Sequence, residues 1–140
     1  MTLILDSSGV LAGLARTERA HEGVRHALLD AEPPLVLSPF VAAEVDYLLA
    51  TRNGLDLELD FLADVAAGAY ELVSFDRSDV AAARALLERY ETLGIGLADA
   101  SLVILAERYG TRRILTLDER HFRALRASDG SAFVLLPADG

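Results

Sequence analysis

Four acidic residues stand where carboxylates are unusual, at the ends of apolar runs or inside apolar helical segments. Two of them close the runs "TLILD" (2–6) and "RRILTLD" (112–118), and two lie within the helical patterns of residues 39–52 and 97–109. Burying such a charge is costly unless a partner compensates it. One divalent cation could compensate all of them, and Mg²⁺ or Mn²⁺ suits a site made of carboxylates. The four residues are Asp6, Glu44, Asp99 and Asp118.

Each of these acids also has an ordinary explanation when it is taken alone. Asp6 or Asp118 would be a turn or helix-capping residue. Glu44 lies on the apolar face of its predicted helix, and its head could reach solvent at the edge of that face. Asp99 could complement the helix dipole from the first turn. Four separate explanations are needed where one cation suffices, and two carboxylates about 4 Å apart repel by about 4 kcal/mol at an effective dielectric near 20.

The elements that must position these acids alternate along the chain. Apolar runs predict strands at residues 2–6, 34–38, 70–75, 112–118 and 132–137. Helical patterns cover residues 17–30, 39–52, 55–67, 76–92 and 97–109. Strands separated by helices imply a three-layer α/β/α sandwich with a mostly parallel central sheet, and we expect one domain over residues 1–140. Ligands of such sheets bind beyond the carboxyl ends of the strands, where Asp6 and Asp118 are expected.

Composition excludes several classes of protein. The chain of 140 residues has no cysteine, which rules out a disulfide framework and a zinc–thiolate site. The start "MTLILDSS" lacks the basic segment of a signal peptide, and no apolar run is long enough to span a membrane. We therefore expect a cytoplasmic protein without membrane contacts.

The net charge of −9 argues against a nucleic-acid partner, but the basic residues are unevenly distributed. Residues 108–126 contain six arginines and two acids, which gives 6 − 2 = +4. Arginine binds phosphate in a bidentate manner, so this segment could contact RNA. The alternative is a solvated basic face or pairing with acids of the fold. The candidate phosphate contacts are Arg108, Arg112, Arg113, Arg120 and Arg123.

Four motifs in this order resemble the PIN-domain nucleases, most closely the VapC-type toxins of bacterial toxin–antitoxin pairs. They are "LILDSSGVLA", "LSPFVAAEVDYLL", "LADASLVILAER" and "ILTLDERHF", and the resemblance spans essentially the whole chain. It implies an endoribonuclease that depends on Mg²⁺, with Mn²⁺ as a substitute, and that a cognate antitoxin protein holds inactive. Position by position, the family's four acids correspond to Asp6, Glu44, Asp99 and Asp118.

The resemblance also assigns roles within this set. Asp6, Asp99 and Asp118 are the expected metal ligands, whereas Glu44 is either a ligand or the residue that orients the attacking water. Ser8 and Thr116 match small hydroxyl residues that support the site. Many members carry a further acid in a T-x-D-x-D-F pattern, but this chain has "TLDERHF", which leaves open whether one or two ions are bound. His121 in this motif could be a general acid, although a structural role is the commoner one.

Three other functions are compatible with an acidic site on an α/β fold, namely a receiver domain, a phosphatase and an interaction module. A signalling receiver domain would need a pocket lysine, and the chain has none; a haloacid dehalogenase phosphatase would need an acid where Ser8 stands. A non-enzymatic interaction module with a degenerate PIN-like site is the remaining alternative. The resemblance also implies a homodimer, for which a stripe on the predicted helix 55–67 is a candidate surface, although such stripes more often face their own core. The stripe consists of Leu55, Leu59, Leu62 and Ala66.

Overall fold

A central sheet of five parallel strands organises the computed structural model of the chain, which describes residues 2–140. The strand order is β3-β2-β1-β4-β5, and all four pairings are parallel. The strands are β1 (Leu3–Leu5), β2 (Leu35–Leu37), β3 (Glu71–Leu72), β4 (Arg113–Leu115) and β5 (Val134–Leu136). The predicted parallel sheet is therefore confirmed, with shorter strands than the apolar runs suggested.

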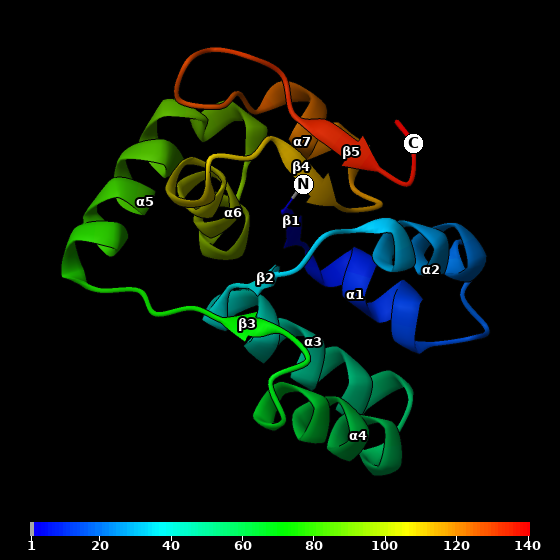
Figure 1. The fold of residues 1–140 in the computed structure, drawn as a ribbon. Coiled ribbons are helices and arrows are strands. Elements are labelled where there is room, and N and C mark those ends of the chain that lie inside the picture. Colours follow the sequence, from blue (N-terminus) through cyan, green and yellow to red (C-terminus); the bar gives the residue numbers. More distant parts are fainter. Residues whose placement is uncertain (1) are drawn as a thin grey trace.

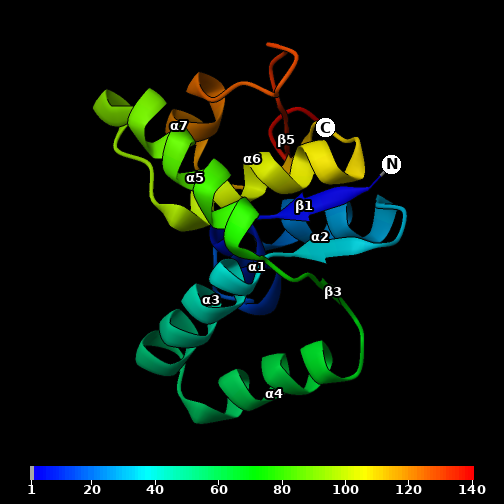
Figure 2. The ribbon, with the colours of Figure 1, turned by 90° about the vertical axis from the view of Figure 1, so that its left-hand side faces the viewer.

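Helices cover both faces of this sheet, which confirms the three-layer α/β/α sandwich (Figures 1 and 2). The chain runs from β1 outward to β3 and then crosses back to β4 and β5, so right-handed crossovers place the two sets of helices on opposite faces. Among residues 2–140, no helix is long and apolar enough to cross a membrane. The helices are α1 (Ser7–Leu14), α2 (His21–Asp30), α3 (Pro39–Arg52), α4 (Leu55–Ala66), α5 (Arg77–Arg89), the 3₁₀ turn η1 (Glu91–Leu93), α6 (Leu97–Tyr109) and α7 (Glu119–Ala124).

The helices α3 and α4 form a hairpin that projects from the body of the domain, as Figure 2 shows. Ser38 caps the start of α3 by accepting a hydrogen bond from the N–H of Phe40 at 3.2 Å, and Pro39 occupies the first helical position. Both features follow the helix-start signals of the sequence. The hairpin therefore carries Glu44 on its inner arm, close to the sheet, and extends α4 into solvent.

The core is aliphatic, and one glycine fixes how closely α1 approaches it. Leu3, Ile4 and Leu5 of β1 are fully buried at the centre of the sheet. A Cβ atom at Gly9 would lie only 2.7 Å from the carbonyl oxygen of Leu115, so any larger residue would push α1 away from β4. This close approach sets the first turn of α1 against the carboxyl end of β4.

The structure contains two helices that the sequence patterns did not predict. The α1 segment "SSGVLAGL" carries two glycines and is mostly buried, so it shows no amphipathic period. The α7 segment has only six residues, too few for a periodic signal. The helix expected from residue 17 begins instead at His21, and the strand expected over 70–75 pairs only at Glu71–Leu72, an exposed edge.

Candidate active site

The carboxyl ends of β1 and β4 form the edge at which the acidic residues meet. The crossovers leave β1 in opposite directions at this point, and ligands of open α/β sheets bind at such a switch. Asp6 directly follows β1, and its N–H donates to the carbonyl oxygen of Leu115 at 2.9 Å. Asp118 begins α7 three residues after β4 ends. The structure thus places both strand-end acids at one edge.

Two hydroxyl groups hold the Asp6 carboxylate. Its Oδ2 atom accepts hydrogen bonds from Ser8 Oγ at 2.9 Å and from Thr116 Oγ1 at 2.6 Å. Asp6 is only 4% exposed, and burial raises its pKa to about 6, although the hydrogen bonds from Thr116 and Ser8 lower it. The negative charge of Asp99 contributes to this raised pKa to a smaller extent than burial does. Ser8 and Thr116 therefore lie where supporting residues were expected, and they stabilise the ionised form of a costly buried acid.

Asp99 lies in the first turn of α6, and a histidine faces its carboxylate. The side chain is 18% exposed, and its Oδ2 atom is 3.0 Å from Nδ1 of His121. Burial raises the pKa of Asp99, the nearby His121 lowers it, and the charge of Asp118 raises it. In this structure His121 thus gives the buried carboxylate a hydrogen-bonding partner within the chain.

Asp118 is both a helix-capping residue and a member of the acidic site. Its Oδ1 atom accepts the N–H of His121 at 3.1 Å, which caps the start of α7. Its Oδ2 atom lies 3.1 Å from the Nδ1 atom of the same His121. Asp118 is therefore a helix cap, and it also shares an imidazole with Asp99.

The expectation that Glu44 lies on the buried face of its helix is wrong. The buried stripe of α3 consists of Val41, Val45 and Leu49, one helical turn apart, and Glu44 lies at its exposed border. The carboxylate of Glu44 accepts a hydrogen bond from Ser7 Oγ on α1. Glu44 is thus tied to the residue that follows Asp6 and faces the same edge of the sheet from α3.

Carboxylate oxygens are the donors that Mg²⁺ and Mn²⁺ prefer, so this donor set fits the expected metal in its chemistry. Within residues 2–140, however, no three His, Cys, Asp or Glu side chains already converge as a metal site. The hydrogen bonds give the reason, since hydroxyls hold one oxygen of Asp6 and His121 draws Asp99 and Asp118 together. Metal binding at this edge would require the carboxylates to reorient.

Comparison with known families and proteins identifies the fold. The model of the PIN domain matches residues 3–127. The chain belongs to the PIN-domain family. Ribonuclease VapC26 of Mycobacterium tuberculosis is 44% identical to this PIN domain over 135 residues, which are 96% of this chain and 100% of that protein.

Solved structures agree with this PIN-domain assignment at the level of the fold. VapC20 of Mycobacterium tuberculosis, described as a toxin that cleaves the sarcin–ricin loop, has a TM-score of 0.77 at 17% identity and covers 83% of this chain and 89% of its own. A toxin–antitoxin complex from Klebsiella pneumoniae has a TM-score of 0.65 at 17% identity. The match covers 88% of this chain and 92% of the chain in that complex. These similarities support the fold alone, whereas membership of the PIN-domain family, shown by the match over residues 3–127, argues against the receiver-domain and phosphatase alternatives.

The candidate RNA-contacting arginines of this PIN domain are divided between the two edges of the sheet. Arg112 and Arg113 precede or begin β4 and lie at the edge away from the acids, and Arg108 lies in the last turn of α6, at the end of that helix opposite Asp99. Arg108 is also held by Asp79 at 2.9 Å and by the carbonyl of Ser74. These three arginines do not adjoin the acidic site.

The other two candidates, Arg120 and Arg123, lie on α7 beside His121. Arg123 bridges Glu119 at 2.9 Å and Asp139 at 2.7 Å, so its charge is largely used within the fold. Arg120 is exposed, and in the described part of the chain it has no hydrogen bond or ion pair. Arg120 is therefore the arginine best placed to contact a phosphate near the acids.

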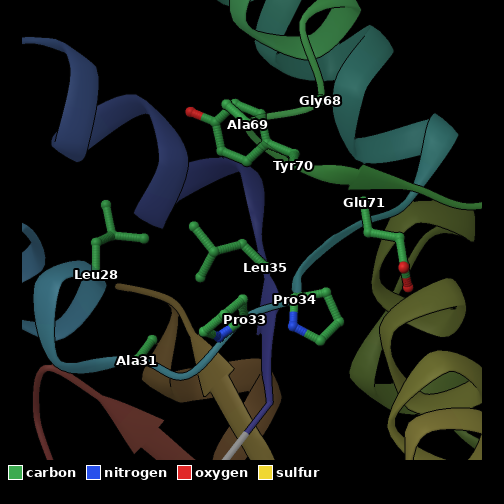
Figure 3. Close-up of a pocket in the computed structure, with 9 residues that line it drawn as sticks. All are labelled: Leu28, Ala31, Pro33, Pro34, Leu35, Gly68, Ala69, Tyr70 and Glu71. Carbon is green, nitrogen blue, oxygen red and sulfur yellow. The ribbon is translucent and has the colours of Figure 1, made fainter.

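A cavity of about 460 Å³ opens at the opposite edge of the sheet, and it lacks the chemistry of the acidic site. Figure 3 shows Pro33, Pro34 and Leu35 on one side and Tyr70 and Glu71 on the other, where the chain enters β2 and β3. Its single acid, Glu71, is hydrogen-bonded to Tyr109. The acids at the carboxyl edge remain the better candidate for catalysis.

The sequence analysis missed Ser7 and did not predict that His121 contacts Asp99. Ser7 contacts Glu44 from 37 positions away, and His121 contacts Asp99 from 22 positions away. Both contacts depend on the short helices α1 and α7, which carry no amphipathic signal. The departure from the family pattern in "TLDERHF" was the one sequence feature that pointed to His121.

Proposed function

We propose that this PIN domain is a divalent-metal-dependent endoribonuclease and the toxin of a toxin–antitoxin pair. The observation that carries the proposal is that Asp6, Asp99, Asp118 and Glu44 lie at the carboxyl edge of the sheet, where His121 contacts both Asp99 and Asp118. The 44% identity to Ribonuclease VapC26 over nearly the whole chain supports RNA as the substrate. We expect the protein to act in the cytoplasm.

Each residue of the site has a separate proposed role. Asp6, Asp99 and Asp118 are the proposed ligands of Mg²⁺ or Mn²⁺, and Ser8 and Thr116 fix the orientation of Asp6. Ser7 directs the Glu44 carboxylate toward the site, where it binds the ion or orients the attacking water. A bound divalent cation would supply an acidified water and neutralise charge on the phosphoryl oxygens. A side-chain nucleophile is not needed.

Incubation with total cellular RNA tests this proposal, with new 5′ and 3′ ends mapped by sequencing. We expect discrete ends with Mg²⁺ or Mn²⁺ and none with a chelator. The Asp99→Asn protein, purified in parallel, detects contaminating nucleases, because the asparagine oxygen can still accept a hydrogen bond from His121 and should leave the protein folded. Cleavage that persists in the chelator or in this variant would contradict a metal-dependent nuclease at this site.

The α4 arm offers a surface for the proposed antitoxin. Leu55, Leu59 and Leu62 are 62%, 52% and 43% exposed, so the stripe faces solvent rather than its own core. The same helix carries the acids Asp56, Glu58, Asp60 and Asp64 and no basic residue. Two copies that met through α4 would bring like charges together, whereas a basic amphipathic segment would complement both its charge and its leucines. We propose that the antitoxin binds here, and the homodimer predicted from the resemblance forms elsewhere.

Replacing Leu59 by arginine separates these two uses of α4. We expect the affinity for the antitoxin to fall at least about tenfold, because the substitution removes a central apolar contact and adds a charge that repels a basic partner. The mass from light scattering should stay that of a dimer. Val80→Ser, at an exposed apolar residue on α5, is the matched control. Conversion of a dimer to a single-chain mass by Leu59→Arg would show that α4 joins two copies, and a wild-type single-chain mass would contradict the dimer.

A further inference from the structure

The acidic site contains two gaps between neighbouring carboxylates, and they are filled differently. His121 Nδ1 lies between Asp99 and Asp118, at 3.0 Å from one Oδ2 atom and 3.1 Å from the other. The gap between Asp6 and Asp99 has no such group, since the side chains that contact Asp6 within residues 2–140 are the neutral hydroxyls of Ser8 and Thr116. Repulsion between carboxylates is therefore relieved by an N–H donor in the first gap and left unrelieved in the second.

The imidazole is held in its gap by the local structure of α7. The N–H of His121 donates to Asp118 Oδ1 at 3.1 Å, so backbone and side chain contact the same carboxylate. The next residue, Phe122, is 1% exposed and anchors the helix in the core. A divalent cation held by both Asp99 and Asp118 would need these carboxylate oxygens as ligands. Those oxygens already face the imidazole, so such an ion would have to displace His121.

We propose that His121 takes the place of a second metal ion, so that this site binds a single divalent cation, which Asp6 and Asp99 would hold. The inference rests on the metal dependence of the proposed function and specifies its stoichiometry. The inference narrows the ligand set proposed above, because Asp118 would then act through His121 and α7 as a positioning residue that holds the imidazole against Asp99. For this contact Nδ1 must carry the ring proton, because both of its partners are carboxylate oxygens.

Titration with Mn²⁺ alone tests the inference without any RNA. Isothermal calorimetry should give one ion per wild-type chain, and the electron paramagnetic resonance spectrum should be that of an isolated Mn²⁺. Replacing His121 by aspartate removes the N–H and adds a carboxylate, so we expect two ions per chain and the broadened spectrum of neighbouring Mn²⁺ ions. Asparagine keeps an N–H donor near the position of Nδ1, so His121→Asn should still bind one ion.

Two further variants are controls for the Mn²⁺ titration of His121→Asp. His26→Asp makes the same change at an exposed histidine of α2 and should leave one ion per chain. If thermal melting shows that His121→Asp does not fold, His121→Ala opens the same gap without added charge and should also gain a second ion.

The possible outcomes separate this inference from the proposed function. Two ions per wild-type chain would overturn the inference and leave a metal-dependent nuclease intact. Weaker binding of the one ion by both His121→Asn and His121→Ala would identify the imidazole as a direct ligand and would also overturn it. No binding by the wild-type protein would overturn the metal dependence itself, and the inference with it.

Discussion

Replacing Asp99 by asparagine should reduce metal-dependent RNA cleavage by about a hundredfold or more while the protein stays folded. Loss of groups that only orient metal ligands typically costs 10- to 100-fold, and Asp99 lies between Asp6 and Asp118 as a proposed ligand. The amide oxygen can still accept a hydrogen bond from His121, so the local packing should persist. Because burial raises the pKa of Asp99, removing its charge should leave the melting temperature equal or higher.

The measurement is the initial rate of cleavage of one RNA substrate with Mg²⁺ or Mn²⁺, together with thermal melting of both proteins. Asp60→Asn, at an exposed residue of α4, is the matched control and should cleave at the wild-type rate. Cleavage by Asp99→Asn at more than a tenth of the wild-type rate would remove Asp99 from the catalytic set.

The same variant separates an enzyme from a silent interaction module. An enzyme should lose cleavage in Asp99→Asn and still bind its protein partner. If the wild-type protein and Asp99→Asn bind that partner equally and neither cleaves RNA in the presence of metal, the interaction module is the better description.

Metal-free protein should lose stability as the pH rises from about 4 to about 6, and Asp6 should be the main cause. Its pKa is raised from 3.8 to about 6 because the carboxyl group is buried, so in this range the folded state holds a proton that the unfolded state has released. Stability therefore falls with rising pH and is lowest, for this group, above pH 6. At 1.36 kcal/mol per pH unit, the two pKa values correspond to about 3 kcal/mol.

Urea denaturation of wild type and Asp6→Asn from pH 4 to pH 8, with a chelator present, measures this effect. We expect the variant to match the wild type near pH 4 and to exceed its free energy of unfolding by about 3 kcal/mol at pH 7. Asparagine can still accept hydrogen bonds from Ser8 and Thr116, so the comparison isolates the charge. Saturating Mn²⁺ at pH 7 should stabilise the wild type, because the ion binds the folded state. The difference in the free energy of unfolding between the wild type and Asp6→Asn should then become smaller. A variant no more stable than wild type at pH 7 would contradict a buried, destabilising carboxylate at Asp6.

The sequence predicted the parts of the site that depend on strand ends and long helices. Apolar runs that end in an acid located Asp6 and Asp118 at one edge, because parallel strands share a direction. Asp99 stood out because an acid interrupts an otherwise apolar helix. These inferences need only the order of the elements, which the alternation of apolar runs and helical segments supplies.

What the sequence could not predict depends on how short elements pack. The exposed border position of Glu44 follows from a buried stripe at Val41, Val45 and Leu49, and a one-position rotation of the helix separates a buried residue from an exposed one. The contact of His121 with Asp99 requires α7, a helix of six residues. The division of the arginines between two edges follows from the direction in which β4 and α6 run, so a cluster in sequence became two groups in space.

The position of β4 beside the central strand β1 also sets when a nascent chain can complete the acidic site. Asp6 leaves the ribosome 112 residues before Asp118, and β1 has no neighbour on its β4 side until residues 113–115 have been synthesised. At about 5 to 20 residues per second, that interval is on the order of ten seconds. A nuclease assembled in this order has no complete set of acids while most of its chain is still being translated.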